Sequence, residues 1–235
     1  MNRSDHPSWA AVPDLAARFV ADPDLNRTLS WLMQRCAELP GVRASALLLA
    51  GEEGVLEVAA ASSGLARQLH QLESRIAEGP SQDSYANSRR IDCADLTEAG
   101  PRWPRYAAAA LRVEIRAVEA FPLRLPAGPI GALTLCFRQV GERPEDELER
   151  AQALADVTAL GVAGSRANQD KARADQLQGA LDSRVLIEQA KGLLAERLGV
   201  SPDEAFTTLR SHARNNHLRL AEVCTSVLDG TLTVH

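Results

Sequence analysis

Long apolar segments are missing from this chain of 235 residues. It contains no stretch of about 18 apolar residues, the length that a membrane-spanning helix needs. The start of the chain, MNRSDHPSWAAVPDLAARF, has no basic region followed by an apolar core, so it does not resemble a signal peptide. We therefore expect a soluble, cytoplasmic protein that does not associate with membranes.

Metal-binding, disulfide and catalytic patterns are also absent. The cysteines form no CxxC or Cys/His ligand pattern, which disfavours a disulfide framework or a zinc site; they are Cys36, Cys93, Cys136 and Cys224. There is no HExxH and no GxSxG, and AKGLL at 190–194 is not a phosphate loop because its glycine follows the lysine. We therefore predict no catalytic residues, no metal and no cofactor.

The formal net charge of −5 argues against a generally basic nucleic-acid binder, but the charge is unevenly distributed. Residues 171–235 contain eight Lys/Arg and eight Asp/Glu, so the net negative charge belongs to residues 1–170. From Ala205 to Ala221 the chain has three arginines, two histidines and no acidic residue. Such a local basic segment matters more for an anionic partner than the total charge does.

Helices and β-hairpins alternate in the first part of the chain. Residues 14–38 predict an opening helix that ends at the LPG of 39–41. VRASALLLA and VLEVAAA flank the short turn GEEG and predict an antiparallel hairpin. RAVEAFPLRL and IGALTLCFR predict a second hairpin, in which Pro126, Gly128 and Pro129 mark the turn and are not expected inside a central strand.

Between the hairpins lies a segment of about fifty residues. It begins with a predicted helix near 64–77 and continues as the irregular EGPSQDSYANSRRIDCADLTEAGPRWPRYAAAALRVE. Long, partly irregular segments inside a compact domain tend to be binding loops. We therefore look for a ligand site in this part of the chain.

From Pro144 onward the sequence is helical for over fifty residues without a proline. Its middle, GSRANQDKARADQ, is polar and indicates a domain boundary near 165–172; the sequence leaves open whether the helix crosses it or breaks at Gly164. After Gly199, SPDE predicts a new helix with Ser201 as N-cap, Pro202 at its first position and a capping box closed by residue 204. A third helix is expected over about 218–229.

The first part of the chain resembles a GAF domain. The resemblance is carried by the order of EGPSQDSYANSRRIDCADL, RWPRYAAAALRVEIRAVEAFPLRL, GPIGALTLCFR and ELERAQALADVTALGVA. It implies a central antiparallel sheet with flanking helices, and a small-molecule pocket between the sheet and the middle loops. The candidate contacts of this pocket are Asp83, Tyr85, Trp103 and Phe121, although each of them also suits a purely structural role.

An enzymatic alternative exists within the same resemblance, a GAF-type free methionine sulfoxide reductase. Many relatives have a cysteine after EGP, where this chain has Ser81. The chemistry needs an attacking thiolate and a second thiol that resolves the intermediate. Only Cys93 lies in the middle loops, which disfavours this alternative.

The C-terminal helices predict a small bundle when residues are placed at about 100° per step. Ala190 falls on the core face of the long helix, while Leu177, Leu181 and Val185 form a second apolar stripe that continues into Gly192. The second stripe suits helix pairing between two subunits, and the small glycine lets another backbone approach closely. Two apolar faces therefore predict two partners for one helix.

Basic residues are expected on the outside of this bundle. Ala205, Phe206 and Leu209 form the inner face of the second helix, which leaves Arg210 and Arg214 outside, four residues apart. Like charges at that spacing are destabilising by a few tenths of a kcal/mol, which favours an anionic partner as the reason for the pair. Lys191 lies at the edge of the core face, Asn216 in the turn after the second helix, and Arg219 at the start of the third helix. Two of these residues also suit a structural role: Lys191 could form a salt bridge with Glu188, and Asn216 could cap a helix.

Residues 184–230 closely resemble an ANTAR domain, the three-helix RNA-binding output module of bacterial antiterminators. The matching motif pieces are IEQAKG at 187–192, SxxEAF at 201–206 and LR at 209–210, followed by Asn216, Leu220 and Val223, which match the family's NxxLxxV with one step of difference in register. The resemblance implies an RNA surface of Lys191, Gly192, Arg210, Arg214, Asn216 and Arg219, supported by the bundle core of Ala190, Ala205, Phe206 and Leu209.

Together the two resemblances imply an α+β protein with four parts: an N-terminal tail (1–13), a GAF-like sensory domain (14–166), a helical connector (167–176) and an ANTAR RNA-binding domain (177–231). Its expected function is a signal-controlled, homodimeric regulator that binds paired hairpins in nascent mRNA and prevents a terminator from forming. It is not expected to be an enzyme. Two alternatives for the tail remain open, a DNA-binding helix-turn-helix module and a protein-interaction module for an acidic partner.

Overall fold

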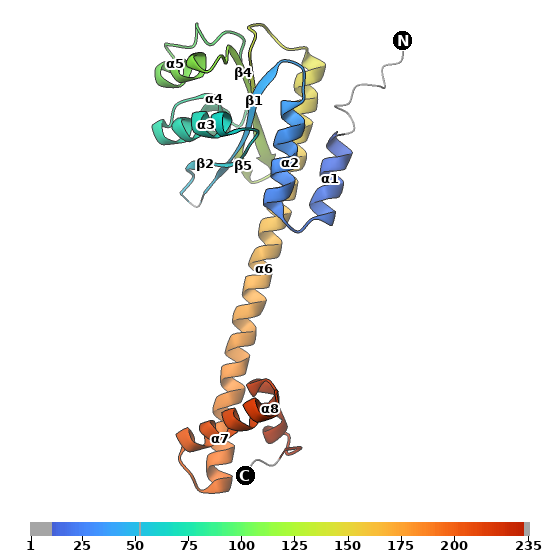
Figure 1. Cartoon of the computed structure of the whole chain (residues 1–235), viewed down its shortest axis with the longest axis vertical. Helices are drawn as coiled ribbons and strands as arrows, with labels where there is room; N and C mark the ends of the chain where they lie inside the picture. The colour runs from blue at the N-terminus through green and yellow to red at the C-terminus, as the bar shows by residue number, and fades with distance from the viewer. Residues whose placement is uncertain (1–10, 52, 233–235) are drawn as a thin grey trace. The chain divides into compact units, whose positions relative to one another are not determined.

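The computed structural model describes residues 11–51 and 53–232 and has mixed α+β architecture, as expected (Figure 1). The predicted opening helix over 14–38 is wrong in one respect, because it is two helices, α1 (Ala11–Ala21) and α2 (Leu25–Ala37). Pro23 lies in the break, and the side chain of Asp24 caps α2 by accepting from the backbone N–H groups of Asn26 and Arg27 at 3.0 and 3.3 Å. A proline followed by an N-cap residue restarts the helix in a new direction.

Five antiparallel strands form one sheet in the order β2-β1-β5-β4-β3. Both predicted hairpins are confirmed: β1 (Val42–Ala50) pairs with β2 (Leu56–Ala61), and β4 (Ala117–Leu125) pairs with β5 (Gly128–Phe137). The short β3 (Ile91–Cys93) adds to the far side of β4. The middle strand of the sheet is therefore β5.

The expectation that Gly128 and Pro129 stay outside a central strand is wrong, because they are the first two residues of β5. Pro129 pairs with β4 there, whereas the ladder between β1 and β5 reaches only Gly131. Pro122 inside β4 similarly lies beyond the residues that pair with β3. A strand tolerates a missing N–H where one of its sides has no ladder partner.

Helices cover both faces of the sheet (Figure 1). One face packs against α3 (Gly64–Ile76), α4 (Pro80–Asn87) and α5 (Pro104–Arg112), and the other packs against α2 and the first turns of α6 (Glu145–Leu198). The middle segment is thus less irregular than the sequence indicates, because it contains α4, β3 and α5. Alternation along β4 sends Phe121 and Leu123 to the α2/α6 side, and Val118 and Ala120 to the α3/α5 side.

The chain divides into two compact units between Arg166 and Ala167, and α6 is one helix that belongs to both. In the second unit, α6 packs with α7 (Pro202–Asn215) and α8 (Leu220–Leu228) around a core of Ala190, Leu194, Ala205, Leu209, Ala213, Val223, Cys224 and Val227. The predicted cap of α7 is confirmed, since Ser201 and Glu204 form the capping box and Pro202 is the first helical residue. Among the described residues, no helix is both long and apolar enough to cross a membrane.

Candidate functional site

The outer face of α7 presents two arginines one helical turn apart. Ala205, Leu209 and Ala213 are buried at spacings of four residues, which turns Arg210 and Arg214 to the exposed side of the helix. Within residues 11–51 and 53–232, neither they nor Arg219 forms an ion pair, whereas several arginines of the first unit do. These exposed guanidinium groups keep their hydrogen-bond donors available for an anionic partner.

Lys191 and Phe206 meet where α6 packs against α7. The lysine Nζ lies 6.0 Å from the centroid of the Phe206 ring and 3.0 Å from a carboxylate oxygen of Glu188. The sequence places Phe206 in the bundle core, but its ring is only partly buried, unlike Ala190, Ala205 and Leu209, which are 0% exposed. Arg210 follows Phe206 by one turn and is exposed, so a second cation is placed on the same side of α7 as this partly buried ring.

This aromatic ring is a candidate contact that sequence reasoning missed. Its spacing from Ala205 and Leu209 fits a core position, so periodicity alone assigns it to the inside. The signal that could have found it is the neighbouring cation, since aromatic side chains flanked by Lys or Arg are the platforms on which unpaired bases stack.

The connection from α7 to α8 is exposed over residues 214–219. Asn216 ends α7, and its side-chain Nδ2 donates to the His212 carbonyl oxygen at 2.9 Å. Arg219 precedes α8, and its backbone N–H donates to a carboxylate oxygen of Glu222 at 3.1 Å. The asparagine therefore has a capping role in the structure, while the Arg219 side chain stays exposed.

Gly192 lies on the exposed side of α6, where a Cβ would meet no atom of the described chain within 4 Å. The second apolar stripe is also exposed, with Leu177, Leu181 and Val185 at 63, 58 and 56%. Among the described residues of the second unit, no side chain contacts a Cβ at position 192, and none covers the three stripe residues.

The four candidate pocket residues of the first unit do not form one cluster. Asp83 accepts hydrogen bonds from the Trp103 indole at 3.1 Å and from Arg102 Nε at 2.7 Å, so these two candidates are joined next to α4 and α5. Tyr85 packs at the other end of that face, near Leu48 and Leu56. Phe121 is 0% exposed and belongs to the core on the opposite face of the sheet.

A buried polar cluster fills part of the face that α3 and α4 cover. Glu73 accepts from the Ser81 backbone N–H at 2.6 Å and from the Ser81 hydroxyl at 2.9 Å, and it lies 2.6 Å from His70 Nδ1. The other ring nitrogen of His70 lies 3.8 Å from Cys136 Sγ, and the Ser81 hydroxyl lies 2.8 Å from that of Thr134. Each of these five residues is 0% exposed. Ser81 is therefore part of a structural network.

His70 is held as a cation in this cluster. Burial lowers the pKa of His70. The hydrogen bonds with Cys136 and Glu73 and the charge of Glu73 raise this pKa by more than burial lowers it, so that it reaches about 10. At neutral pH the imidazolium and the Glu73 carboxylate form a buried ion pair.

Cys93 is poorly placed for thiol chemistry. Burial raises the pKa of its thiol, which lowers the fraction of reactive thiolate. Cys93 and Cys136 pair with Val118 from opposite sides, so two strand spacings, roughly 10 Å, separate their Cα atoms. A disulfide requires less than about 7 Å. Among the described residues, no group of three or more His, Cys, Asp or Glu side chains could hold a metal ion.

Comparisons with known families identify a domain in each unit. The model of the GAF domain matches residues 22–163, and the model of the ANTAR domain matches residues 175–228. None of the curated protein sequences matches the chain significantly.

Solved structures resemble the first unit in fold. The GAF domain of a phosphoenolpyruvate-protein phosphotransferase from Coxiella burnetii is 16% identical, with a TM-score of 0.57 over 69% of this chain and 96% of that one. The free methionine-R-sulfoxide reductase from Neisseria meningitidis, solved with its substrate, is 15% identical, with a TM-score of 0.55 over 68% of this chain and 91% of that one. A GAF domain region from Geobacter sulfurreducens is 20% identical, with a TM-score of 0.51 over 63% of this chain and 97% of that one. At these identities the likeness concerns the fold alone.

Proposed function

The chain belongs to the GAF domain family and has an ANTAR domain after its GAF domain, and from this premise we propose that it is a signal-controlled regulator that binds hairpins in nascent mRNA and promotes transcription antitermination. The observation that carries the proposal is the match of residues 175–228 to the ANTAR domain, together with the exposed arginines of α7. Binding to paired hairpins would keep a terminator from forming, so that transcription continues.

The proposed RNA surface combines charge with a stacking platform. Arg210, Arg214 and Arg219 are exposed cations that suit phosphate oxygens, and Lys191 adds a fourth beside its partner Glu188. The partly buried Phe206 ring suits a base without a Watson–Crick partner. Hairpin loops offer both features at once, which is why a looped RNA fits this surface better than a straight duplex.

We propose that the protein acts as a cytoplasmic homodimer and that its role is regulatory rather than catalytic. The exposed stripe of Leu177, Leu181 and Val185 supports pairing of two α6 helices, because three large apolar side chains on one face are otherwise left in water. The distance between Cys93 and Cys136 argues against the reductase alternative. Turnover of a small sulfoxide that is lost in Cys93→Ser would overturn the regulatory assignment.

Sequencing the RNA that crosslinks to the protein in cells tests the proposed function. We expect enrichment of transcripts with two neighbouring hairpins, one of which overlaps a terminator. The recovered RNA is then competed against duplex DNA of the same sequence at equal salt, and we expect the RNA to bind more tightly. Tighter binding of the DNA would identify a helix-turn-helix module instead, and recovery of no RNA above background would favour a protein-interaction module.

A further inference from the structure

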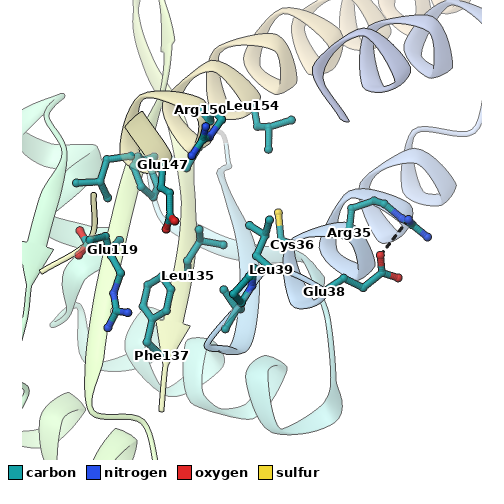
Figure 2. A pocket seen from close by; sticks show the side chains of 16 residues that line it. Arg35, Cys36, Glu38, Leu39, Glu119, Leu135, Phe137, Glu147, Arg150 and Leu154 are labelled. Carbon is teal, nitrogen blue, oxygen red and sulfur yellow. Dashed lines mark ion pairs between the residues drawn. The ribbon is translucent and has the colours of Figure 1, made fainter. Parts of the chain in front are cut away.

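A cavity of about 260 Å³ lies on the face of the sheet that α2 and α6 cover (Figure 2). Phe121, Leu135 and Phe137 line it from β4 and β5, while Leu39 follows α2 and Leu154 comes from α6. Its size is close to the lower end of the range for small-molecule sites, about 300–1,000 Å³. Asp83 and Trp103 lie on the opposite side of the sheet, so of the four pocket residues that the sequence predicts only Phe121 lines this cavity.

Two residues that line this cavity contain buried polar atoms without a partner. They are Oε2 of Glu119, a side chain that is 2% exposed, and Nε of Arg143. The Arg143 guanidinium stacks 4.3 Å from the centroid of the Phe137 ring, and its NH2 group donates to the Gln139 carbonyl oxygen at 2.9 Å. Native proteins rarely leave buried polar atoms unpartnered, so these two atoms are where a polar group bound in the cavity would find hydrogen-bond partners.

The charges around the cavity favour an anion. Arg35 is paired with Glu38, and Arg150 with Asp146, whereas Arg143 forms no ion pair within the described part of the chain. Burial and the neighbouring Asp92 raise the pKa of Glu119 to about 9, against smaller opposing effects of Arg90 and Arg143. In its neutral form this carboxyl does not repel an anion. The remaining acid, Glu147, is exposed.

We propose that this cavity binds a small monocarboxylate with an apolar body, whose carboxylate accepts a hydrogen bond from Arg143 Nε beside Glu119. The apolar body occupies the space between Phe121, Leu135 and Leu154. This site belongs to the first unit alone, so the proposal stands or falls independently of RNA binding.

Calorimetric titration of the full chain at pH 7 with three ligands of equal chain length tests the charge preference. We expect octanoate to bind, octanamide to bind more weakly and octylamine not to bind. Equal or tighter binding of octanamide or octylamine would overturn the proposal, and so would the absence of octanoate binding.

Matched variants test the position of the site. Arg143→Gln should weaken octanoate binding by about tenfold or more, as expected when a charge-assisted hydrogen bond is lost. The control Arg138→Gln, at an exposed arginine whose partner is Glu114, should bind octanoate as the wild type does. Ala151→Leu, which places a larger side chain in the cavity, should abolish binding. Unchanged octanoate affinity in both cavity variants would contradict the assignment. If octanoate does not bind and Arg143→Gln abolishes self-association, a second copy of the chain occupies the cavity and the proposal is wrong.

Discussion

At the scale of single residues, the proposed stacking role of the Phe206 ring is what would separate base recognition from simple charge attraction. The ring centroid lies 6.0 Å from Lys191 Nζ and the side chain is only partly buried, so part of it is accessible to a base. Base–aromatic stacking is worth about 1–3 kcal/mol per base.

Phe206→Leu should therefore weaken RNA binding by roughly 5- to 150-fold. The change removes the ring but leaves every charge in place, so the salt dependence of binding should stay as in the wild type. Filter binding at several salt concentrations measures both quantities, and thermal unfolding checks the fold. An affinity equal to that of the wild type would exclude a stacking role for this ring.

Glu73 is the residue on which the buried cluster of the first unit depends. It joins His70 of its own helix to the start of α4 through Ser81. Removing one partner of a buried ion pair typically costs about 3–5 kcal/mol, so Glu73→Gln should lower the free energy of unfolding by about that amount. Urea unfolding followed by tryptophan fluorescence measures it, with Glu57→Gln, exposed on β2, as the control.

The same cluster predicts a pH dependence. The pKa of His70 is raised to about 10 in the folded chain, from an ordinary value of 6.5. A group whose pKa is raised on folding stabilises the protein fully below the unfolded value, and that stabilisation is lost as the pH rises through the folded value. The first unit should thus lose stability between about pH 6.5 and 10, and Glu73→Gln should lose less over that range. An equal loss in both would contradict the pairing of His70 with Glu73.

At the scale of elements, Gly192 of α6 makes no close contact within the described part of its own bundle that would require a glycine. A Cβ at position 192 has space around it, and alanine exceeds glycine in helix propensity by roughly 1 kcal/mol. Gly192→Ala should therefore raise the stability of the second unit by up to about that amount while weakening RNA binding or self-association, because the proposed partner approaches closely there.

Gly179→Ala is the matched control for that change. This glycine also lies in α6 with nothing near its Cβ, but it faces away from the second stripe. It should stabilise the helix equally and leave both kinds of binding unchanged, as measured by circular dichroism and by sedimentation. If the 192 and 179 variants behave alike in binding, no close contact forms at 192.

The stripe on α6 predicts the assembly state. Leu181→Glu should convert a homodimer to a monomer, because it places a charge in the proposed helix-helix seam. Sedimentation velocity of the full chain measures this, with Gln176→Glu, an exposed position on the side of α6 away from the stripe, as the control. A wild-type chain that is monomeric at micromolar concentration would contradict the proposed dimer.

Elements defined by local signals could be predicted from the sequence, and those defined by distant partners could not. The hairpins and the Ser201 cap follow from turn residues and capping chemistry. The sequence could not show on which face of the sheet Phe121 lies. The strand β4 is buried on both sides, so it lacks the alternation of polar and apolar residues that marks an outer face. The structural role of Ser81 could not be predicted from the sequence either, because its hydrogen-bond partners come from the distant elements α3 and β5.

At the scale of the whole molecule, the two domains differ in charge and, in the proposed function, in their partners. The net negative charge belongs to residues 1–170, while the segment from Ala205 to Ala221 is free of acids. The helix α6 belongs to both units and supplies residues to the cavity near its start and Lys191 near its end. A sensory domain and an RNA-binding domain that share one helix are the arrangement that the proposed function requires.

The salt dependence of RNA binding by an Arg210→Ala, Arg214→Ala double variant tests the central claim most directly. Each phosphate contact contributes about 0.7–0.9 to the slope of log K against log salt, so the variant should bind more weakly with a slope shallower by roughly 1.4–1.8. The control Lys171→Ala, Arg173→Ala removes the same charge from an exposed stretch of α6 and should leave the slope unchanged. A folded Arg210→Ala, Arg214→Ala variant with wild-type affinity and wild-type slope would contradict the proposed RNA surface.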